Sequence, residues 1–108
     1  MIILIAYFFG GIFLSNGIPH FVSGVMGLPF QSPFAKPPGR GLSSSRLNVI
    51  WGFANFVMSY GLVIHVGHFD LHVLSDVSAF GLGALLNSLM LAQQFGRIHG
   101  GNHPTKSS

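Results

Sequence analysis

The sequence predicts an all-α integral membrane protein, a bundle of three transmembrane helices of which the first is kinked at Pro19. Composition is the first observation: 6% of the 108 residues are charged and 49% are hydrophobic, whereas about a quarter are charged in a typical soluble domain. The second observation is that three apolar stretches, each near the roughly 20 residues that cross a bilayer, alternate with polar segments. A soluble fold of this size cannot cover its surface with so few charges, so one transmembrane domain is expected.

The first span is expected at residues 2–26. No basic residue precedes its apolar run, as one would in a secretory signal peptide, so we expect the span to be retained. Pro19 removes one backbone hydrogen bond and clashes with the carbonyl of Ser15, which predicts a kink or break near this residue. Asn16, Ser15 or a neighbouring helix is expected to satisfy the backbone groups that the proline frees.

A linker is predicted at residues 28–45, because its four prolines are incompatible with a regular helix. Phe30 and Phe34 are expected to enter the membrane interface, and Ser43 to Ser45 to cap the next helix. The second span is predicted at residues 46–66, with Trp51 and Tyr60 toward its ends as interfacial aromatics. A third span, capped by Ser75 or Asp76, is predicted at residues 75–94, and a polar tail at residues 96–108.

The positive charges predict the orientation. With three spans, the linker and the tail share one side of the membrane, and all the basic residues fall there: Lys36, Arg40, Arg46, Arg97 and Lys106. We therefore expect the N-terminus outside and the C-terminus in the cytoplasm, in a bacterial inner membrane. The charges lack the clustering of a nucleic-acid-binding surface, so no nucleic-acid partner is expected.

Each span carries small or polar residues at helical spacing, which places them on one face. Such faces let membrane helices approach closely and form hydrogen bonds. The residues predicted to pack are Asn16, Ser23 and Gly27 in the first span, Asn48, Gly52, Asn55 and Ser59 in the second, and Ala79, Gly83 and Asn87 in the third. The alternative is a homo-oligomeric transporter or channel, with its pathway lined by Asn16, His20, Asn55 and Asn87.

Two histidines are candidates for cofactor binding. His20 and His65 can each ligate a pigment or haem, and the candidate cofactor is a tetrapyrrole shared with a partner subunit. They are predicted at different depths, so they are not expected to form a bis-histidine site within one chain. The simpler interpretation of His20 is a donor to carbonyls that Pro19 leaves free.

A second cluster surrounds the turn between the last two spans. His65, His68, Asp70 and His72 are suitable ligands for zinc or a similar metal, although their spacing matches no known metal motif. The alternative is a polar turn at the membrane surface. No catalytic motif is present: there is no Cys, no nucleophile elbow and no phosphate-binding glycine loop.

The segment GIPHFVSGVMGLPFQSPF, followed by NVIWGFANF, resembles a family of small bacterial multi-span membrane proteins. The core formed by Gly17, Pro19, His20 and Phe21 also resembles the first helix of DoxX-like membrane proteins, over about a fifth of the chain. The resemblance implies a compact helical bundle and transfers no catalytic or binding residue. The expected function comes from the small or polar face on every span, because a protein of this size cannot bury them all. These faces predict a non-catalytic accessory subunit of a larger membrane complex, with a photosynthetic or respiratory complex as one candidate.

Overall fold

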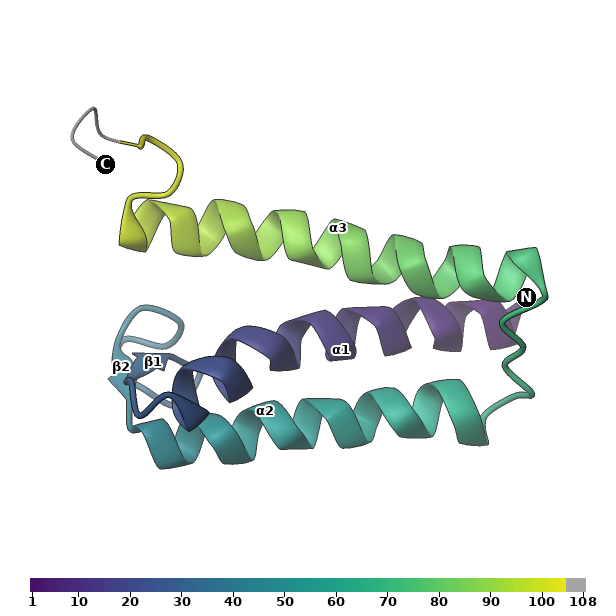
Figure 1. Cartoon of the computed structure of the whole chain (residues 1–108), viewed down its shortest axis with the longest axis horizontal. Coiled ribbons are helices and arrows are strands. Elements are labelled where there is room, and N and C mark those ends of the chain that lie inside the picture. The colour runs from purple at the N-terminus through teal and green to yellow at the C-terminus, as the bar shows by residue number, and fades with distance from the viewer. Residues whose placement is uncertain (105–108) are drawn as a thin grey trace.

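The fold consists of three long helices and one short hairpin, seen in a computed structural model that describes residues 1–104 (Figure 1). The elements are α1 (Ile2–Val25), β1 (Phe30–Gln31), β2 (Leu42–Ser43), α2 (Ser45–Tyr60), the π-helical turn η1 (Gly61–His65) and α3 (Leu74–His99). Three helical segments, with η1 continuing α2, are long and apolar enough to cross a membrane, as the sequence predicts.

Helix α1 lies between α2 and α3, and consecutive helices run in opposite directions (Figure 1). The linker folds back as an antiparallel pair in which Phe30 lies opposite Ser43 and Gln31 opposite Leu42. This hairpin lies beside the start of α2 and the end of α3 (Figure 1). The loop from η1 to α3 closes the opposite end of the bundle. The two flanking helices thus pack on opposite sides of one central helix.

The central position of α1 depends on glycines that face both neighbours. Gly10, Gly17 and Gly24 recur every seven residues and are buried against α2. A Cβ at Gly11 would overlap the backbone of Phe80 in α3. In a bilayer, helices associate through close van der Waals packing, for which small residues are needed. The main chain of α1 therefore touches a second helix on each side.

Each flanking helix contributes a matching glycine. Gly52 of α2 lies against the backbone of Phe21, and a Cβ at Gly83 of α3 would overlap the carbonyl of Phe8. These two residues occupy the packing positions that the sequence predicts for them. Ala79 of α3 is half-buried.

Two residues that the sequence predicts to pack in the first span, Ser23 and Gly27, are not buried against a neighbouring helix. Gly27 has a φ of 76° and is exposed, with open space where its Cβ would lie. The reason is that α1 ends at Val25, so Gly27 belongs to the turn and packs against no helix. Ser23 is only half-buried, because its neighbour Gly24 occupies the contact with Val49 of α2.

The cap at the start of α2 agrees with the sequence prediction, whereas both ends of α3 differ from it. Helix α1 continues through Pro19 as one helix, and the kink there remains a prediction. Ser44 caps α2, with its hydroxyl accepting from the Leu47 amide at 3.2 Å, whereas neither Ser75 nor Asp76 caps α3, whose N-cap is Val73. Helix α3 includes Gly96 and continues beyond Gln94 to His99, where Gly100 ends it in a left-handed conformation with φ of 86°.

We predict opposite effects for two glycines two residues apart in α3. Gly83→Ala should lower the free energy of unfolding by about 1–3 kcal/mol, the usual cost of overpacking, because the new methyl meets the Phe8 carbonyl. Gly81→Ala should be neutral or stabilise by up to about 1 kcal/mol, since its Cβ enters open space and alanine favours helix. Reversible denaturant unfolding in mixed micelles would measure both. A Gly83→Ala protein as stable as the parent would contradict this packing.

Candidate functional site

Polar side chains of α1 and α2 form hydrogen bonds across their interface. The amide nitrogen of Asn16 donates to Asn55 Oδ1 at 3.0 Å, and Asn55 in turn donates to the Trp51 carbonyl at 2.8 Å. Nearer the loop between η1 and α3, the Ser59 hydroxyl donates to the Gly10 carbonyl at 2.7 Å. These bonds satisfy polar groups that would otherwise face lipid.

A separate set of hydrogen bonds connects α1 to α3. Asn87 donates to the Ser15 hydroxyl at 2.8 Å and to the Ile12 carbonyl at 3.2 Å. Asn87 therefore lies in the α1–α3 interface, whereas Asn16 and Asn55 lie between α1 and α2. Within one chain, the structure divides these three asparagines between two helix interfaces, and the homo-oligomeric channel stays a prediction.

Asn48 is the point at which α1, α2 and the hairpin meet. Its side chain is fully buried, and its nitrogen donates to the carbonyls of Phe30, Ser43 and Ser44 at 3.0–3.2 Å. Its oxygen lies 2.8 Å from His20 Nδ1. Because an amide oxygen only accepts, Nδ1 must carry a proton and donate. The asparagine thus sets the tautomer of a histidine that is 3% exposed.

The hairpin places aromatic rings around the same histidine. The rings of Phe30 and Phe95 have centroids 5.5 Å and 6.4 Å from the imidazole, and the Trp51 ring lies 6.4 Å away. The side-chain oxygen of Gln31, Oε1, accepts a hydrogen bond from His99 Nε2 at 2.9 Å and so connects β1 to the end of α3. Phe30 is half-buried among these rings, and Phe34 stacks edge-on against Trp51 at 5.0 Å.

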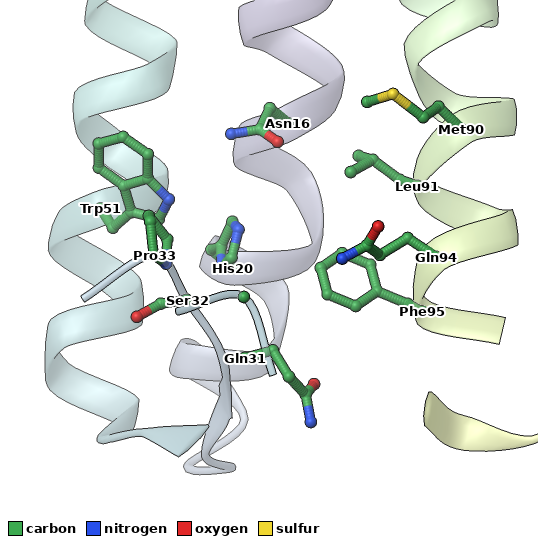
Figure 2. Close-up of a pocket in the computed structure, with 11 residues that line it drawn as sticks. Asn16, His20, Gln31, Ser32, Pro33, Trp51, Met90, Leu91, Gln94 and Phe95 are labelled. Carbon is green, nitrogen blue, oxygen red and sulfur yellow. The ribbon is translucent and has the colours of Figure 1, made fainter. Parts of the chain in front are cut away.

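A pocket of about 260 Å³ opens next to His20 (Figure 2). All three helices and the linker contribute to its lining, which consists of Asn16, His20, Gln31, Ser32, Pro33, Gly39, Trp51, Met90, Leu91, Gln94 and Phe95. Its volume lies just below the range of roughly 300–1,000 Å³ of small-molecule sites. The sequence predicts two of these residues, Asn16 and His20, as candidates.

The sequence predicts Trp51 as an interfacial aromatic and does not predict its place in this pocket. Its indole nitrogen Nε1 is buried and has no hydrogen-bond partner within residues 1–104. Position near a span end indicates an interfacial aromatic, and that pattern says nothing about the surroundings of the N–H group. The lining thus combines a buried donor, a buried imidazole and an apolar wall from α3.

The two histidines predicted as cofactor ligands lie at opposite ends of the bundle. His20 is buried beside the hairpin, whereas His65 ends η1, is exposed, and contacts the Tyr60 ring with centroids 5.2 Å apart. As expected from the sequence, they do not form one site.

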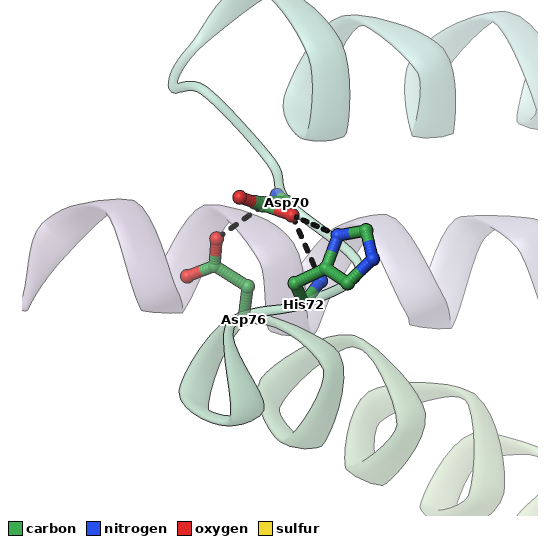
Figure 3. A network of polar contacts seen from close by, with 3 residues as sticks. All are labelled: Asp70, His72 and Asp76. Carbon is green, nitrogen blue, oxygen red and sulfur yellow. Dashed lines mark hydrogen bonds and ion pairs between the residues drawn. The ribbon is translucent and has the colours of Figure 1, made fainter.

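The candidate metal ligands near the turn are mostly directed into solvent. Asp70 accepts from the backbone N–H of His72 at 2.8 Å and pairs with its ring at 3.1 Å, and Asp76 accepts from the Asp70 amide (Figure 3). Within residues 1–104 no three His, Cys, Asp or Glu side chains are grouped to hold a metal ion. His65, His68, Asp70 and His72 therefore do not converge, and the turn is ordered by local hydrogen bonds.

Comparison of the chain with models of protein families, with curated proteins and with solved structures found no significant match.

We predict that Asn48→Ala destabilises the hairpin end of the bundle. The carbonyls of Phe30 and Ser43 lose the side-chain donor and the His20 N–H loses its acceptor, and a buried polar group left unpaired costs about 1–3 kcal/mol. The loss should exceed about 2 kcal/mol in unfolding, and hydrogen exchange should accelerate at residues 30 and 31. Asn102→Ala is the control, since it removes one exposed bond to the Gln93 carbonyl and should cost less than about 0.5 kcal/mol. Equal losses for the two variants would contradict the role of Asn48.

Proposed function

We propose that the protein is a non-catalytic accessory subunit of a larger membrane complex, inserted with its N-terminus outside and its C-terminus in the cytoplasm. The observation that carries the proposal is the one-sided packing of α3. Only 11% of the most apolar segment of α3 is buried, compared with 33% for α1. One face of α3 packs on α1 through Gly83 and Asn87.

The side of α3 that faces away from α1 is also rich in small residues. Ser78, Gly81, Ser88 and Ala92 are exposed and recur at helical spacing, and Gly81 has open space around it. Small residues in a lipid-facing position contribute little to lipid contact and permit a helix to approach closely. This second face supports docking of a transmembrane helix from a partner.

The distribution of charge favours a different protein over a second copy as that partner. Lys36, Arg40, Arg46 and Arg97 lie at the hairpin end, whereas the only acidic side chains of the sequence, Asp70 and Asp76, lie at the other end. Copies of one chain insert with the same orientation, so a copy docked along α3 would bring like charges together. A partner with carboxylates at the cytoplasmic level would complement these cations.

Single-cysteine cross-linking in native membranes tests this docking face, because the chain has no cysteine of its own. Gly81→Cys and Ser88→Cys should each form a cross-link to the same other membrane protein. Leu86→Cys is the matched control, as Leu86 is 53% exposed and lies two residues from Ser88, on a different face of the helix. The cross-linked species are identified by mass spectrometry.

Three results would contradict the proposal. Cross-links between two copies of this chain would favour a homo-oligomer. Equal cross-linking from Leu86→Cys would show random collision in the bilayer. Absence of any protein cross-link from Gly81→Cys and Ser88→Cys would indicate that this face contacts lipid alone.

We predict the orientation from the same charges. A cysteine introduced for Lys36 in the linker should react with a membrane-impermeant thiol reagent only after the cells are opened. A cysteine introduced for His68, which is exposed in the other loop, should react in intact cells. The reverse pattern would show that the positive charges lie outside, contrary to the usual bias of cytoplasmic loops.

A further inference from the structure

The pocket beside His20 contains a hydrogen-bond donor that the protein itself leaves unused. Trp51 Nε1 is buried without a partner within residues 1–104, and Figure 2 shows this nitrogen on the side of the indole ring that faces His20. Buried N–H groups are nearly always paired, and an unpaired one calls for a partner that the fold does not supply. The pocket is where such a partner would lie, because Trp51 forms part of its lining.

His20 presents an acceptor to the same pocket. Its Nδ1 donates to Asn48, so in the neutral ring Nε2 carries a lone pair. A buried imidazolium would require a counter-charge, and both carboxylate side chains of the sequence, Asp70 and Asp76, lie at the far end of the bundle. The ring is therefore neutral, and Nε2 accepts. It has no hydrogen bond to any residue between 1 and 104.

One donor and one acceptor select the chemistry of the ligand. The two rings lie 6.4 Å apart between centroids and line the same pocket, so one ligand group can contact both residues. A carboxylate or a phosphate diester can accept from the indole and cannot donate to Nε2, whereas an ammonium group can donate and cannot accept. A hydroxyl group does both. Its oxygen accepts from Trp51 Nε1, and its proton is shared with His20 Nε2.

The rest of the pocket fits the apolar part of such a ligand. Met90, Leu91 and Phe95 supply a wall from α3. Two exposed cations, Arg40 and Arg97, line a separate hollow beyond Gln94. An anionic headgroup would be attracted to those cations, so we expect the pocket beside His20 to hold an uncharged headgroup.

We propose that this pocket binds the hydroxyl headgroup of an uncharged membrane amphiphile, held between Trp51 Nε1 and His20 Nε2. The hydroxyl can belong to an aliphatic alcohol or to a phenol, and the chemistry of recognition is the same. The proposal concerns a site within one chain and does not depend on a partner subunit.

The single tryptophan of the sequence makes the test direct. In ¹⁵N-labelled protein, the side-chain N–H of Trp51 gives the one indole resonance, and hydrogen bonding moves it downfield. The purified full chain in micelles is titrated with dioctanoylglycerol, with its 3-acetyl ester, which has no donor, and with 4-octylphenol. We expect a saturable downfield shift with the alcohol, the phenol or both, and binding at least tenfold weaker for the acetyl ester. The hydroxyl compound that binds more tightly shows whether the natural headgroup is an aliphatic alcohol or a phenol.

A pair of histidine variants tests whether His20 holds the hydroxyl group. His20→Asn keeps a side-chain N–H for Asn48 and removes Nε2, so affinity for the hydroxyl compound should fall about tenfold. His65→Asn, at the exposed far end, should leave affinity unchanged. If His20→Asn does not fold, the comparison of alcohol with ester in the parent protein still decides whether the pocket recognises a hydroxyl group.

Several outcomes would overturn the proposal. Equal binding of the alcohol and its acetyl ester would show that the pocket recognises only an apolar body. Tighter binding of dioctanoyl phosphatidate would place the headgroup at Arg40 and Arg97. An indole resonance that no probe moves, and that exchanges with water, would show that water alone fills the space.

Discussion

The close approach of the α1 backbone to two helices at once is the constraint on which the rest of the structure depends. A central membrane helix must be narrow on two sides, and α1 meets this need with glycine on both. The hydrogen bonds of Asn16, Ser15 and His20 to the flanking helices form only at this separation. Larger residues at Gly11 or Gly17 would move α2 and α3 outward and leave those polar groups in lipid.

This arrangement also explains why a pocket exists at the hairpin end. Since α2 and α3 pack on opposite sides of α1, they do not close over it, and the linker covers the remaining space. Asn48 connects the linker to α1 by binding three carbonyls and His20 together. The pocket beside His20 is therefore a consequence of the helix order, with its floor supplied by α1 and its walls by the other elements.

Composition and span length were sufficient to predict three apolar helices, because the bilayer sets both. The same signals could not identify the central helix, since every span carries small and polar residues at similar spacing. The spacing of Gly27 fits a packing face, whereas the helix ends before it at Val25. The strand pairing of the linker was not predicted, because prolines indicate only the absence of helix. The unpaired N–H of Trp51 depends on residues from four segments and has no local signal.

The central claim is that α1 separates α2 from α3, and paired-cysteine cross-linking tests it most directly. Three double variants are compared with a short bifunctional thiol reagent: Asn16→Cys with Asn55→Cys, Ser15→Cys with Asn87→Cys, and Asn55→Cys with Asn87→Cys. The first two pairs join side chains that are hydrogen-bonded in the structure, so both should cross-link within one chain, whereas the third pair should not. Efficient cross-linking of the third pair, with failure of either of the others, would contradict the arrangement.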